Sequence, residues 1–363
     1  MKRIIVSVSN DLSTDQRVEK VCNTLHQNNF EILLIGRILK NSLPLNRNYK
    51  TKRMSLMFNS GFLFYAEYNL RLFFLILFSK KDILLANDID TLLPNYIVSK
   101  IQRKKIVFDS HELFSEIPEL ETRPTVKKVW QTLEDRILPK LKNTYTVCDS
   151  IAAYFNKKYT TNFKVIKNAP ISKKDSATRS SFSFPHKGKK IILYQGSVNI
   201  GRGLELMIDT MIFLDNHLFV IIGSGDIYEK LKVYVRDKKL ENKVYFLGKL
   251  PPNQLKELTP LADIGISLEE DIGLSYRYAL PNKIFDYIQA KVPILVSDLP
   301  EMKEIVNNYN VGEIVLKRNS ESLANQIKIM IGKDYNLALE KAKKELIWEN
   351  ESIKLLTIFN NLK

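Results

Sequence analysis

The chain alternates short β-branched runs with stretches of helical period, and it does so twice. In the first half this pattern predicts strands at Arg3–Val8, Glu31–Ile35, Ile83–Ala86, Lys105–Phe108 and Thr144–Val147. It predicts helices between them, at Asp15–Asn28, Thr91–Ile101 and Val126–Leu138. The second half predicts strands at Lys190–Tyr194, Leu218–Ile222, Lys243–Phe246, Asp263–Ser267 and Pro293–Val296, with helices at Leu204–Leu214, Ile227–Asp237 and Asn282–Ala290. Strands separated by helices build parallel sheets. The sequence therefore predicts an α/β chain with two Rossmann-like, doubly wound domains.

The domain boundary follows from a change in composition. Residues 171–189 are rich in Ser and Lys and have few periodic apolar residues, which predicts a linker between a domain over 1–170 and a domain over 190–345. Tyr335–Lys363 has a long helical pattern with few breakers. Ligands of doubly wound sheets bind at the carboxyl ends of the strands, so we expect a central cleft between the two domains.

The charge is unevenly distributed. Of the net +15, residues 1–170 carry +11, with 27 Lys and Arg against 16 Asp and Glu. A basic half of this kind can bind nucleic acid, anionic lipid or a phosphorylated substrate. The alternative is that the basic residues are scattered over solvated faces and bind none of these. The two cysteines, Cys22 and Cys148, exclude a disulfide scaffold. Met1-Lys2-Arg3 precedes a strand rather than a signal-peptide h-region, so we expect a cytoplasmic protein.

One segment, Gly61–Phe78, is rich in aromatic residues and leucine. Glu67, Asn69 and Arg71 interrupt it, which argues against a helix that crosses a bilayer. The composition favours a buried amphipathic helix, and a helix that lies on a membrane surface is the alternative.

Polar residues follow the predicted strands of the first half. Asp15 is placed to cap the next helix, whereas Arg17 opposes the helix dipole and needs a partner or ligand. The turn has no glycine-rich fingerprint, which argues against NAD or FAD. The segment Asp109–Phe114 suits sugar binding or acid–base work, with helix capping by Asp109 or Ser110 as the alternative. The histidines have no metal-ligand spacing, and Asp88-Ile89-Asp90 is expected to cap a helix rather than to hold a metal.

Glycine-rich turns follow the strands of the second half. Gly196–Gly203 and Gly223–Asp226 each join a strand to a helix, and Arg202 is placed to neutralise a phosphate. Lys283 opens a further helix, where a cation is unfavourable unless an anion is bound nearby. Asp286, one turn later, suits the diol of a ribose, and an ion pair within the helix is the alternative for both residues.

Together these segments resemble retaining glycosyltransferases of family 4, which have the GT-B fold. The resemblance rests on Asp15–Val18 (D-x-R-V), Val107–Phe114 (D-x-H-E), the two glycine turns, Val244–Gly248 and Asn282–Asp298, and it spans roughly residues 3–310. It implies that a helix over about 346–363 returns to the first domain.

The resemblance also implies roles for individual residues. His111 would contact the donor sugar, Arg202 would replace the lysine that binds the diphosphate, and Lys283 would act beside it as the third catalytic group. Asp286 would be the second acid of E-x7-E. The remaining donor residues are Gly196, Ser197, Gly203, Gly223, Gly225, Leu247, Gly248, Tyr278 and Asn282, with Leu247 and Gly248 near the base. Asp15, Arg17 and Glu112 are expected on the acceptor side.

The sequence departs from the family pattern at three positions. Tyr278 stands where the first acid of E-x7-E is usual, and Glu269, Glu270 or Asp271 are candidates to replace it. Ser197 replaces an arginine, and Lys291 stands where glycine is common.

The resemblance implies a hexosyltransferase that moves a sugar from a nucleotide diphosphate sugar to a saccharide acceptor and retains the anomeric configuration. No metal is expected, because Arg202 and Lys283 supply the positive charge. The basic first half and Gly61–Phe78 favour a lipid-linked acceptor at the cytoplasmic membrane face, in the synthesis of a surface polysaccharide or glycolipid. A sugar-nucleotide epimerase of the same fold and an inactive scaffold are the alternatives. Nucleic acid is not an expected partner, because no recognised binding motif accompanies the basic excess.

Overall fold

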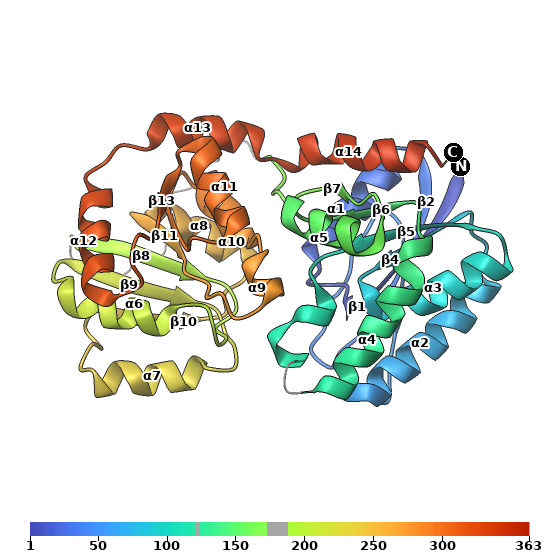
Figure 1. Ribbon diagram of the computed structural model, residues 1–363, viewed down its shortest axis with the longest axis horizontal. Helices are drawn as coiled ribbons and strands as arrows, with labels where there is room; N and C mark the ends of the chain where they lie inside the picture. Colours follow the sequence, from blue (N-terminus) through green and yellow to red (C-terminus); the bar gives the residue numbers. More distant parts are fainter. Residues whose placement is uncertain (121–122, 173–187, 363) are drawn as a thin grey trace. The chain divides into compact units, whose positions relative to one another are not determined.

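The computed structural model describes residues 1–120, 123–172 and 188–362 (Figure 1). The chain divides into two compact units, the first formed by Met1–Asn168 with Trp348–Lys363 and the second by Ala169–Ile347. Most of the linker that the sequence predicts, residues 173–187, lies outside the described residues. Each unit contains one parallel sheet.

The described part of the first unit has a sheet of seven strands in the order β3-β2-β1-β4-β5-β6-β7. The strands are β1 (Lys2–Asp11), β2 (Phe30–Arg37), β3 (Lys50–Met54), β4 (Ile83–Asn87), β5 (Lys105–Ser110), β6 (Thr144–Thr146) and β7 (Lys164–Val165). The helices are α1 (Gln16–Gln27), α2 (Gly61–Phe78), α3 (Ile89–Ile101), α4 (Pro124–Ile137), α5 (Asp149–Tyr159) and α14 (Trp348–Asn360), with 3-10 turns η1 (Phe114–Glu116), η2 (Pro118–Leu120) and η3 (Leu138–Lys140).

The central strands β1 and β4 are buried on both faces of the first sheet, which is why each contains a mostly apolar run. Ile4 and Val6 of β1 pack in one core with residues of α1 and α14, whereas Ile5 packs in the opposite core with residues of α2 and α3. α14 contributes Trp348, whose indole donates to Thr24 Oγ1 at 2.9 Å. The last helix of the chain is thus part of the first core.

The described part of the second unit has a six-stranded sheet in the order β10-β9-β8-β11-β12-β13. The strands are β8 (Lys190–Gln195), β9 (His217–Ile222), β10 (Val244–Gly248), β11 (Ile264–Ser267), β12 (Ile294–Val296) and β13 (Gly312–Ile314). The helices are α6 (Leu204–Thr210), α7 (Tyr228–Asp237), α8 (Pro252–Leu258), α9 (Leu274–Arg277), α10 (Asn282–Gln289), α11 (Pro300–Tyr309), α12 (Ser320–Ile331) and α13 (Asn336–Glu345), with 3-10 turns η4 (Met211–Phe213) and η5 (Thr259–Leu261). Residues of α6, α7 and α12 pack on one face, and residues of α10, α11 and α13 on the other.

Three expectations need correction. The polar strand β3 was not predicted, because its KTKRM sequence lacks an apolar run and its pairing with β2 supplies the stability. The helical pattern at the end of the chain is two helices, α13 and α14, which belong to different units. α2 is helical, but it buries only Phe64, Tyr68, Leu72 and Ile76. Its length and composition are those of a membrane-crossing helix, which is weak evidence by itself.

Candidate active site

The first cluster of polar residues lies at the carboxyl ends of β1, β4 and β5. These three strands are neighbours in the parallel sheet, so the residues that follow them meet at one edge. β5 ends with Asp109 and Ser110, β4 is followed by Asp88, and Ser9 lies near the end of β1. The topology thus collects several carboxylates around His111.

Arg17 and Asp109 form a buried ion pair. The Arg17 guanidinium donates from Nη2 to Asp109 Oδ1 at 2.8 Å and from Nε to Oδ2 at 3.0 Å, and its Nη1 donates to the Ile166 carbonyl at 2.9 Å. The side chain of Arg17 is 4% exposed and that of Asp109 is fully buried. Burial raises the pKa of Asp109, but Arg17 and His111 outweigh it and bring that pKa to about 2. The partner that the sequence required for Arg17 is therefore a carboxylate of the same unit.

His111 lies between two carboxylates. Its Nδ1 is 3.2 Å from Asp88 Oδ2 and its Nε2 is 3.2 Å from Asp109 Oδ2. Burial lowers the pKa of His111, but Asp88 and then Asp109 raise it to about 9. The imidazole is therefore protonated at neutral pH and serves as a fixed cation rather than as a general base.

Asp88 and Asp90 complete this edge. The backbone of Asp88 has a φ of 56°, which is strained for a residue with a side chain. The sequence predicted that Asp88 caps α3, and this is wrong. Its carboxylate instead accepts from the backbone N–H of His111 at 2.7 Å. Burial raises the pKa of Asp88 to about 7 and that of Asp90 to about 6, and Ser9 donates to Asp90. This edge can accept hydrogen bonds from sugar hydroxyls.

The three residues expected on the acceptor side have different environments. Asp15 caps α1, as predicted, and accepts from the backbone N–H of Val18 at 3.1 Å. Arg17 is buried inside the unit, so its contact with an acceptor is excluded by its own pairing with Asp109. Glu112 is exposed. Of the three, the structure leaves Glu112 with the most solvent-exposed side chain.

In the second unit the glycines allow two turns to approach closely. A Cβ at Gly223 would lie 1.8 Å from the carbonyl oxygen of Gly196, and a Cβ at Gly225 would lie 2.4 Å from that of Val198. Gly203 has a φ of 69° and would place a Cβ 2.2 Å from the Leu268 carbonyl oxygen. These glycines are therefore required by backbone packing, whatever they bind. Gly196 and Ser197 are exposed at the end of β8, where a ligand has access.

Lys283 and Arg202 converge on the buried carboxylate of Glu269. Lys283 Nζ donates to Glu269 Oε1 at 2.7 Å, and Arg202 Nη1 is 3.6 Å from the same oxygen. Ser267 Oγ donates to the other oxygen at 2.7 Å. Burial raises the pKa of Glu269, but Lys283 and Arg202 more than offset it, so this pKa is below its usual value. The anion that the sequence required near Lys283 is thus Glu269, and the pair is not formed within α10.

Arg202 has donor capacity left over. Its guanidinium lies 4.6 Å from the ring centroid of Tyr276, and among the described residues its Nε is buried without a hydrogen-bond partner. Lys283 Nζ similarly lies 4.2 Å from the ring centroid of Tyr194. A Cβ at Gly196 would be only 3.4 Å from Lys283 Cε, so the cation lies directly beside the open glycine turn. Two cations on one carboxylate give a net positive charge, which suits a phosphate.

Asp286 lies on the solvent side of α10. Its Oδ2 accepts from Gln195 Nε2 at 3.0 Å, and Thr259 Oγ1 in turn donates to Gln195 Oε1 at 2.9 Å. Asp286 remains exposed, as does Asn282 in the first turn of the same helix. Tyr278, at the position where the family has its first acid, follows α9 and is half-buried. Its phenol cannot take the place of a carboxylate.

Leu247 and Gly248, expected near the nucleotide base, and Lys291 lie at ends of secondary-structure elements in the second unit. Leu247 and Gly248 end β10, and the backbone N–H of Gly223 donates to the Gly248 carbonyl at 2.8 Å, which ties this end to the glycine turn. Lys291 has a φ of 58°, a conformation that explains the glycine usual at that position. Glu269 is fully buried and paired, so of the three candidates for the missing acid it is the one enclosed beside the cations.

Sequence reasoning missed several partners. Asp88 was assigned to capping, and Asp109 was expected to bind sugar, to act in acid–base work or to cap a helix, not to pair with Arg17. Gln195 and Arg318 received no binding role. Arg318 donates to Ser297 Oγ at 2.7 Å and to the Leu268 carbonyl at 3.0 Å, beside Glu269. Residues so far apart in sequence are brought together only by strand order, and no local pattern reveals such a pairing.

The second unit matches a known family. Residues 176–345, slightly less than half of the chain, match the family model of glycosyl transferases group 1. The uncharacterized glycosyltransferase MJ1607 of Methanocaldococcus jannaschii is 30% identical over 141 residues, which are 38% of this chain and 34% of that protein. The chain thus matches about a third of the length of this curated relative.

Solved structures resemble the whole chain. Sucrose-phosphate synthase from Thermosynechococcus elongatus has a TM-score of 0.80 at 13% identity, with 100% of this chain and 99% of that chain covered. A glycosyltransferase from Rickettsia africae has a TM-score of 0.74 at 16% identity, over 99% and 98%. HepE of Anabaena with UDP-glucose has a TM-score of 0.72 at 14% identity, over 99% and 100%. These likenesses confirm the GT-B fold, and with the group 1 match over the second unit they support a transferase enzyme.

Proposed function

We propose that this protein is a retaining glycosyltransferase of family 4 that moves a sugar from a nucleotide diphosphate sugar to a saccharide acceptor. The observation that carries the proposal is the pair of cations, Arg202 and Lys283, held on Glu269 beside the open turn at Gly196. HepE of Anabaena, which shares the fold, has been solved with UDP and with UDP-glucose, and this supports a nucleotide-sugar donor.

The donor would lie along the carboxyl edge of the second sheet. The diphosphate would lie at the Gly196 turn, where the missing side chain admits it next to Lys283 and next to Arg202, whose Nε has no hydrogen-bond partner in the described part of the chain. The exposed carboxylate of Asp286 would accept from the ribose hydroxyls, held in place by Gln195. The base would then reach the end of β10, at Leu247 and Gly248.

The reaction breaks the bond between the anomeric carbon and the diphosphate oxygen and forms a bond from that carbon to an acceptor hydroxyl oxygen, whose proton passes to the leaving diphosphate. Negative charge develops on the leaving group as its bond breaks. Arg202 and Lys283 would stabilise that charge in place of a metal ion. Glu269 keeps both cations oriented before the donor arrives, so little reorganisation is needed. In the first unit, His111 would contact the donor sugar, and the Asp88 carboxylate beside it would accept from a sugar hydroxyl.

The acceptor proposed is a saccharide linked to lipid at the cytoplasmic face of a membrane, in the synthesis of a surface polysaccharide or glycolipid. Two features of the first unit support it: the net charge of +11 over residues 1–170 and the exposed apolar side chains of α2. Glu112, exposed beside the His111 cluster, would lie near the acceptor.

The donor site is tested by thermal shift with UDP, GDP, CDP, ADP and dTDP and with their sugar conjugates. We expect one base class to raise the melting temperature, and Lys283→Gln and Asp286→Ala to weaken its affinity at least about ten-fold. Lys232→Gln on α7 is the matched control, because it removes one exposed charge from the same unit. Stabilisation by none of the nucleotides, or unchanged affinity in Lys283→Gln, would overturn the proposed site.

The reaction is tested by NMR of the product formed from the donor that binds. A product with the anomeric configuration of the donor supports retention, whereas the opposite anomer refutes it. Conversion of the donor sugar to an epimer without any acceptor would instead indicate an epimerase.

A further inference from the structure

The helix α2 has two apolar faces, and only one of them is covered. Phe64, Tyr68, Leu72 and Ile76, four residues apart, pack on the sheet, and the Tyr68 hydroxyl donates to the Val8 carbonyl at 2.6 Å. The opposite face presents a second stripe, formed by Leu63, Leu70, Phe74 and Phe78. A helix with apolar side chains on opposite faces is ordinarily buried in a protein core or in a membrane.

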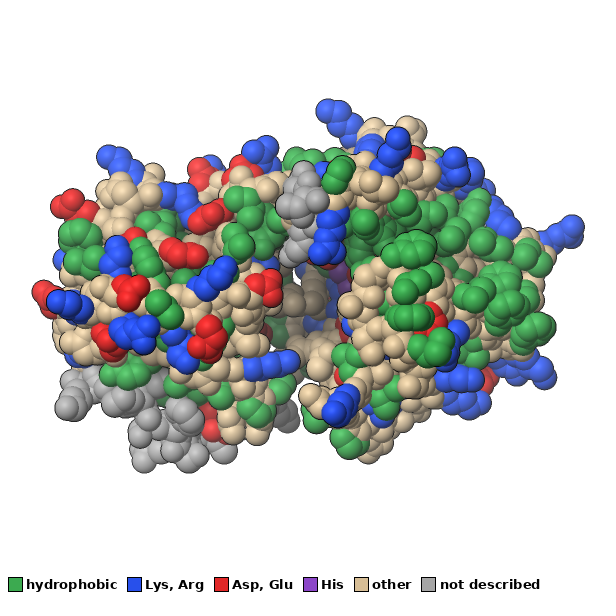
Figure 2. All heavy atoms as spheres, turned by 90° about the horizontal axis from the view of Figure 1, so that it is seen from below, with side chains coloured by type: hydrophobic (Ala, Val, Ile, Leu, Met, Phe, Trp, Pro, Cys, Tyr) green, Lys and Arg blue, Asp and Glu red, His purple; other side chains and the backbone are tan. Residues whose placement is uncertain are grey.

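The second stripe is open to solvent. Phe78 is 81% exposed, Leu70 59% and Phe74 50%, and next to the start of the helix Phe62 is 77% exposed. Figure 2 views the molecule from the side on which α2 lies in Figure 1, and hydrophobic side chains gather there on the first unit. A contiguous apolar patch of this kind on a water-facing surface marks an interaction site.

The two charges within α2 lie on the same outward face as this stripe, where they are paired with each other. Glu67 accepts from the backbone N–H groups of Met57 and Phe58, and it pairs with Arg71 at 2.6 Å. Arg71 also donates to the Ser55 carbonyl at 2.9 Å. Both charges thus hold the preceding loop against the helix, and that loop adds the exposed side chain of Met57 to the apolar surface.

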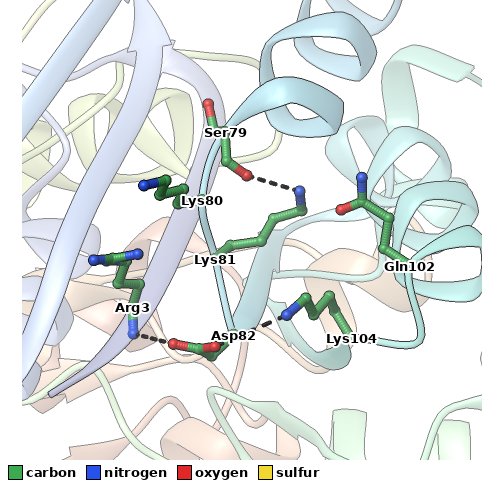
Figure 3. A pocket seen from close by; sticks show the side chains of 7 residues that line it. All are labelled: Arg3, Ser79, Lys80, Lys81, Asp82, Gln102 and Lys104. Atoms are coloured by element: carbon green, nitrogen blue, oxygen red, sulfur yellow. Dashed lines mark hydrogen bonds and ion pairs between the residues drawn. The ribbon is translucent and has the colours of Figure 1, made fainter.

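The carboxyl-terminal end of the helix carries positive charge. An open pocket of about 260 Å³ lies there, lined by Arg3, Ser79, Lys80, Lys81, Asp82, Gln102 and Lys104 (Figure 3). Asp82 is its one carboxylate, and it accepts from the backbone N–H of Arg3 and faces Lys104 at 3.9 Å. Lys81 Nζ donates to the Ser79 carbonyl at 3.0 Å, and burial lowers its pKa. Lys80 is exposed, so the pocket has a net positive charge available to an anion.

We propose that the outward stripe of α2 and this basic pocket form one docking surface for an anionic lipid membrane. The helix would lie in the plane of the interface, with Leu70, Phe74 and Phe78 at the boundary of headgroups and acyl chains and a lipid phosphate in the pocket. The apolar stripe with cations at its end is the pattern that an anionic bilayer complements, and a second copy of this basic surface would meet like charge. The inward stripe stays packed on the sheet, so the helix does not span the bilayer.

The test is flotation of the full chain with vesicles of phosphatidylcholine alone or with about a third phosphatidylglycerol. We expect binding to the anionic vesicles that falls as salt rises. Leu70→Gln with Phe74→Gln should weaken it at least ten-fold, because polar side chains cannot enter the interface. The matched control is Ile329→Gln with Leu337→Gln, two exposed apolar residues of the second unit (61% and 88%). Lys80→Gln with Lys104→Gln should remove the preference for anionic lipid.

Four results would overturn the proposal. Equal binding by the α2 double variant and the wild type would exclude the stripe, and equal binding to both vesicles would exclude the basic pocket. A dimer that the α2 variant dissociates, without vesicle binding by the wild type, would assign the stripe to self-association. Resistance of the bound protein to alkaline carbonate would indicate a spanning helix. The assay needs no nucleotide, so its failure leaves the donor site untouched, and the melting temperature of each variant, measured without nucleotide, shows whether it is folded.

Discussion

Replacing Arg17 by methionine tests the buried ion pair at the centre of the first unit. The substitution retains much of the side-chain volume but leaves the fully buried carboxylate of Asp109 without its bidentate partner. His111 remains 3.2 Å from Asp109 and offsets part of the loss. We therefore expect the first unit to be markedly less stable.

The magnitude follows from the pKa of Asp109. The pKa is about 2 against an ordinary 3.8, and at about 1.4 kcal/mol per unit this difference corresponds to roughly 2.5 kcal/mol. Removing one partner of a buried pair costs about 3–5 kcal/mol in general. With His111 still present, we expect Arg17→Met to lower the free energy of unfolding by about 3 kcal/mol at pH 7.

The pH dependence has a defined sign. Because the pKa of Asp109 is depressed in the folded protein, its contribution is present above pH 3.8 and is lost as the pH falls towards 2. Without Arg17 the pKa of Asp109 rises. The difference between the variant and the wild type should therefore shrink on acidification from pH 7 towards pH 4.

Urea unfolding followed by tryptophan fluorescence is the assay. The only two tryptophans, Trp130 and Trp348, both belong to the first unit, so their emission reports that unit alone. Arg3→Met is the matched control, because the Arg3–Glu31 pair is 45% and 38% exposed and should contribute less than about 1 kcal/mol. Equal losses in the two variants, or a loss in Arg17→Met that does not shrink on acidification, would refute the reasoning.

Two further predictions concern His111 and Gly223. His111→Gln should cost about 2–3 kcal/mol at pH 6.5 and almost nothing near pH 10. The pKa of His111 is raised from 6.5 to about 9, so its stabilising charge is present below pH 6.5 and is lost as the pH rises through 9. Tryptophan-monitored urea unfolding across this range measures it. Gly223→Ala should destabilise the second unit by about 3 kcal/mol or more, because the new Cβ would lie 1.8 Å from the Gly196 carbonyl oxygen. Calorimetry measures this change.

Each of these variants has its own check. A cost of His111→Gln that is the same at pH 6.5 and pH 10 would show that the residue acts by packing rather than by charge. For the glycine, Gly332→Ala is the control, since it has a φ of −81° and meets only the Ile329 carbonyl oxygen at 3.5 Å. It should be neutral or stabilising within about 1 kcal/mol. Similar melting temperatures for the two alanine variants would contradict the close approach at Gly223.

Most central strands were predictable because they are buried on both faces and therefore consist of apolar runs. β1, β4, β8 and β9 all begin within one residue of the predicted position. The strand β3 was not predictable, because its residues are mainly charged and its pairing with β2 stabilises it. The pattern of α2 indicated a helix, but its burial depended on how many neighbours cover it, and periodicity carries no information on that number.

Some features of the candidate site were likewise predictable from the sequence, and others were not. Its glycine turns, and the need for partners at Arg17 and Lys283, could be inferred locally, because a cation in the first turn of a helix opposes the helix dipole wherever that helix lies.

The sequence by itself thus determined two parallel α/β sheets, the cap at Asp15 and the unusual cations of α1 and α10. Only the tertiary structure decided that Asp109 and Glu269 are the anions that these cations meet. Arg17 is separated from Asp109 by 92 residues, and Lys283 from Glu269 by 14. The strength of an ion pair depends on the distance between the charges in space and not on their separation in sequence. The packing of whole sheets sets the strand order that brings these groups within 3 Å.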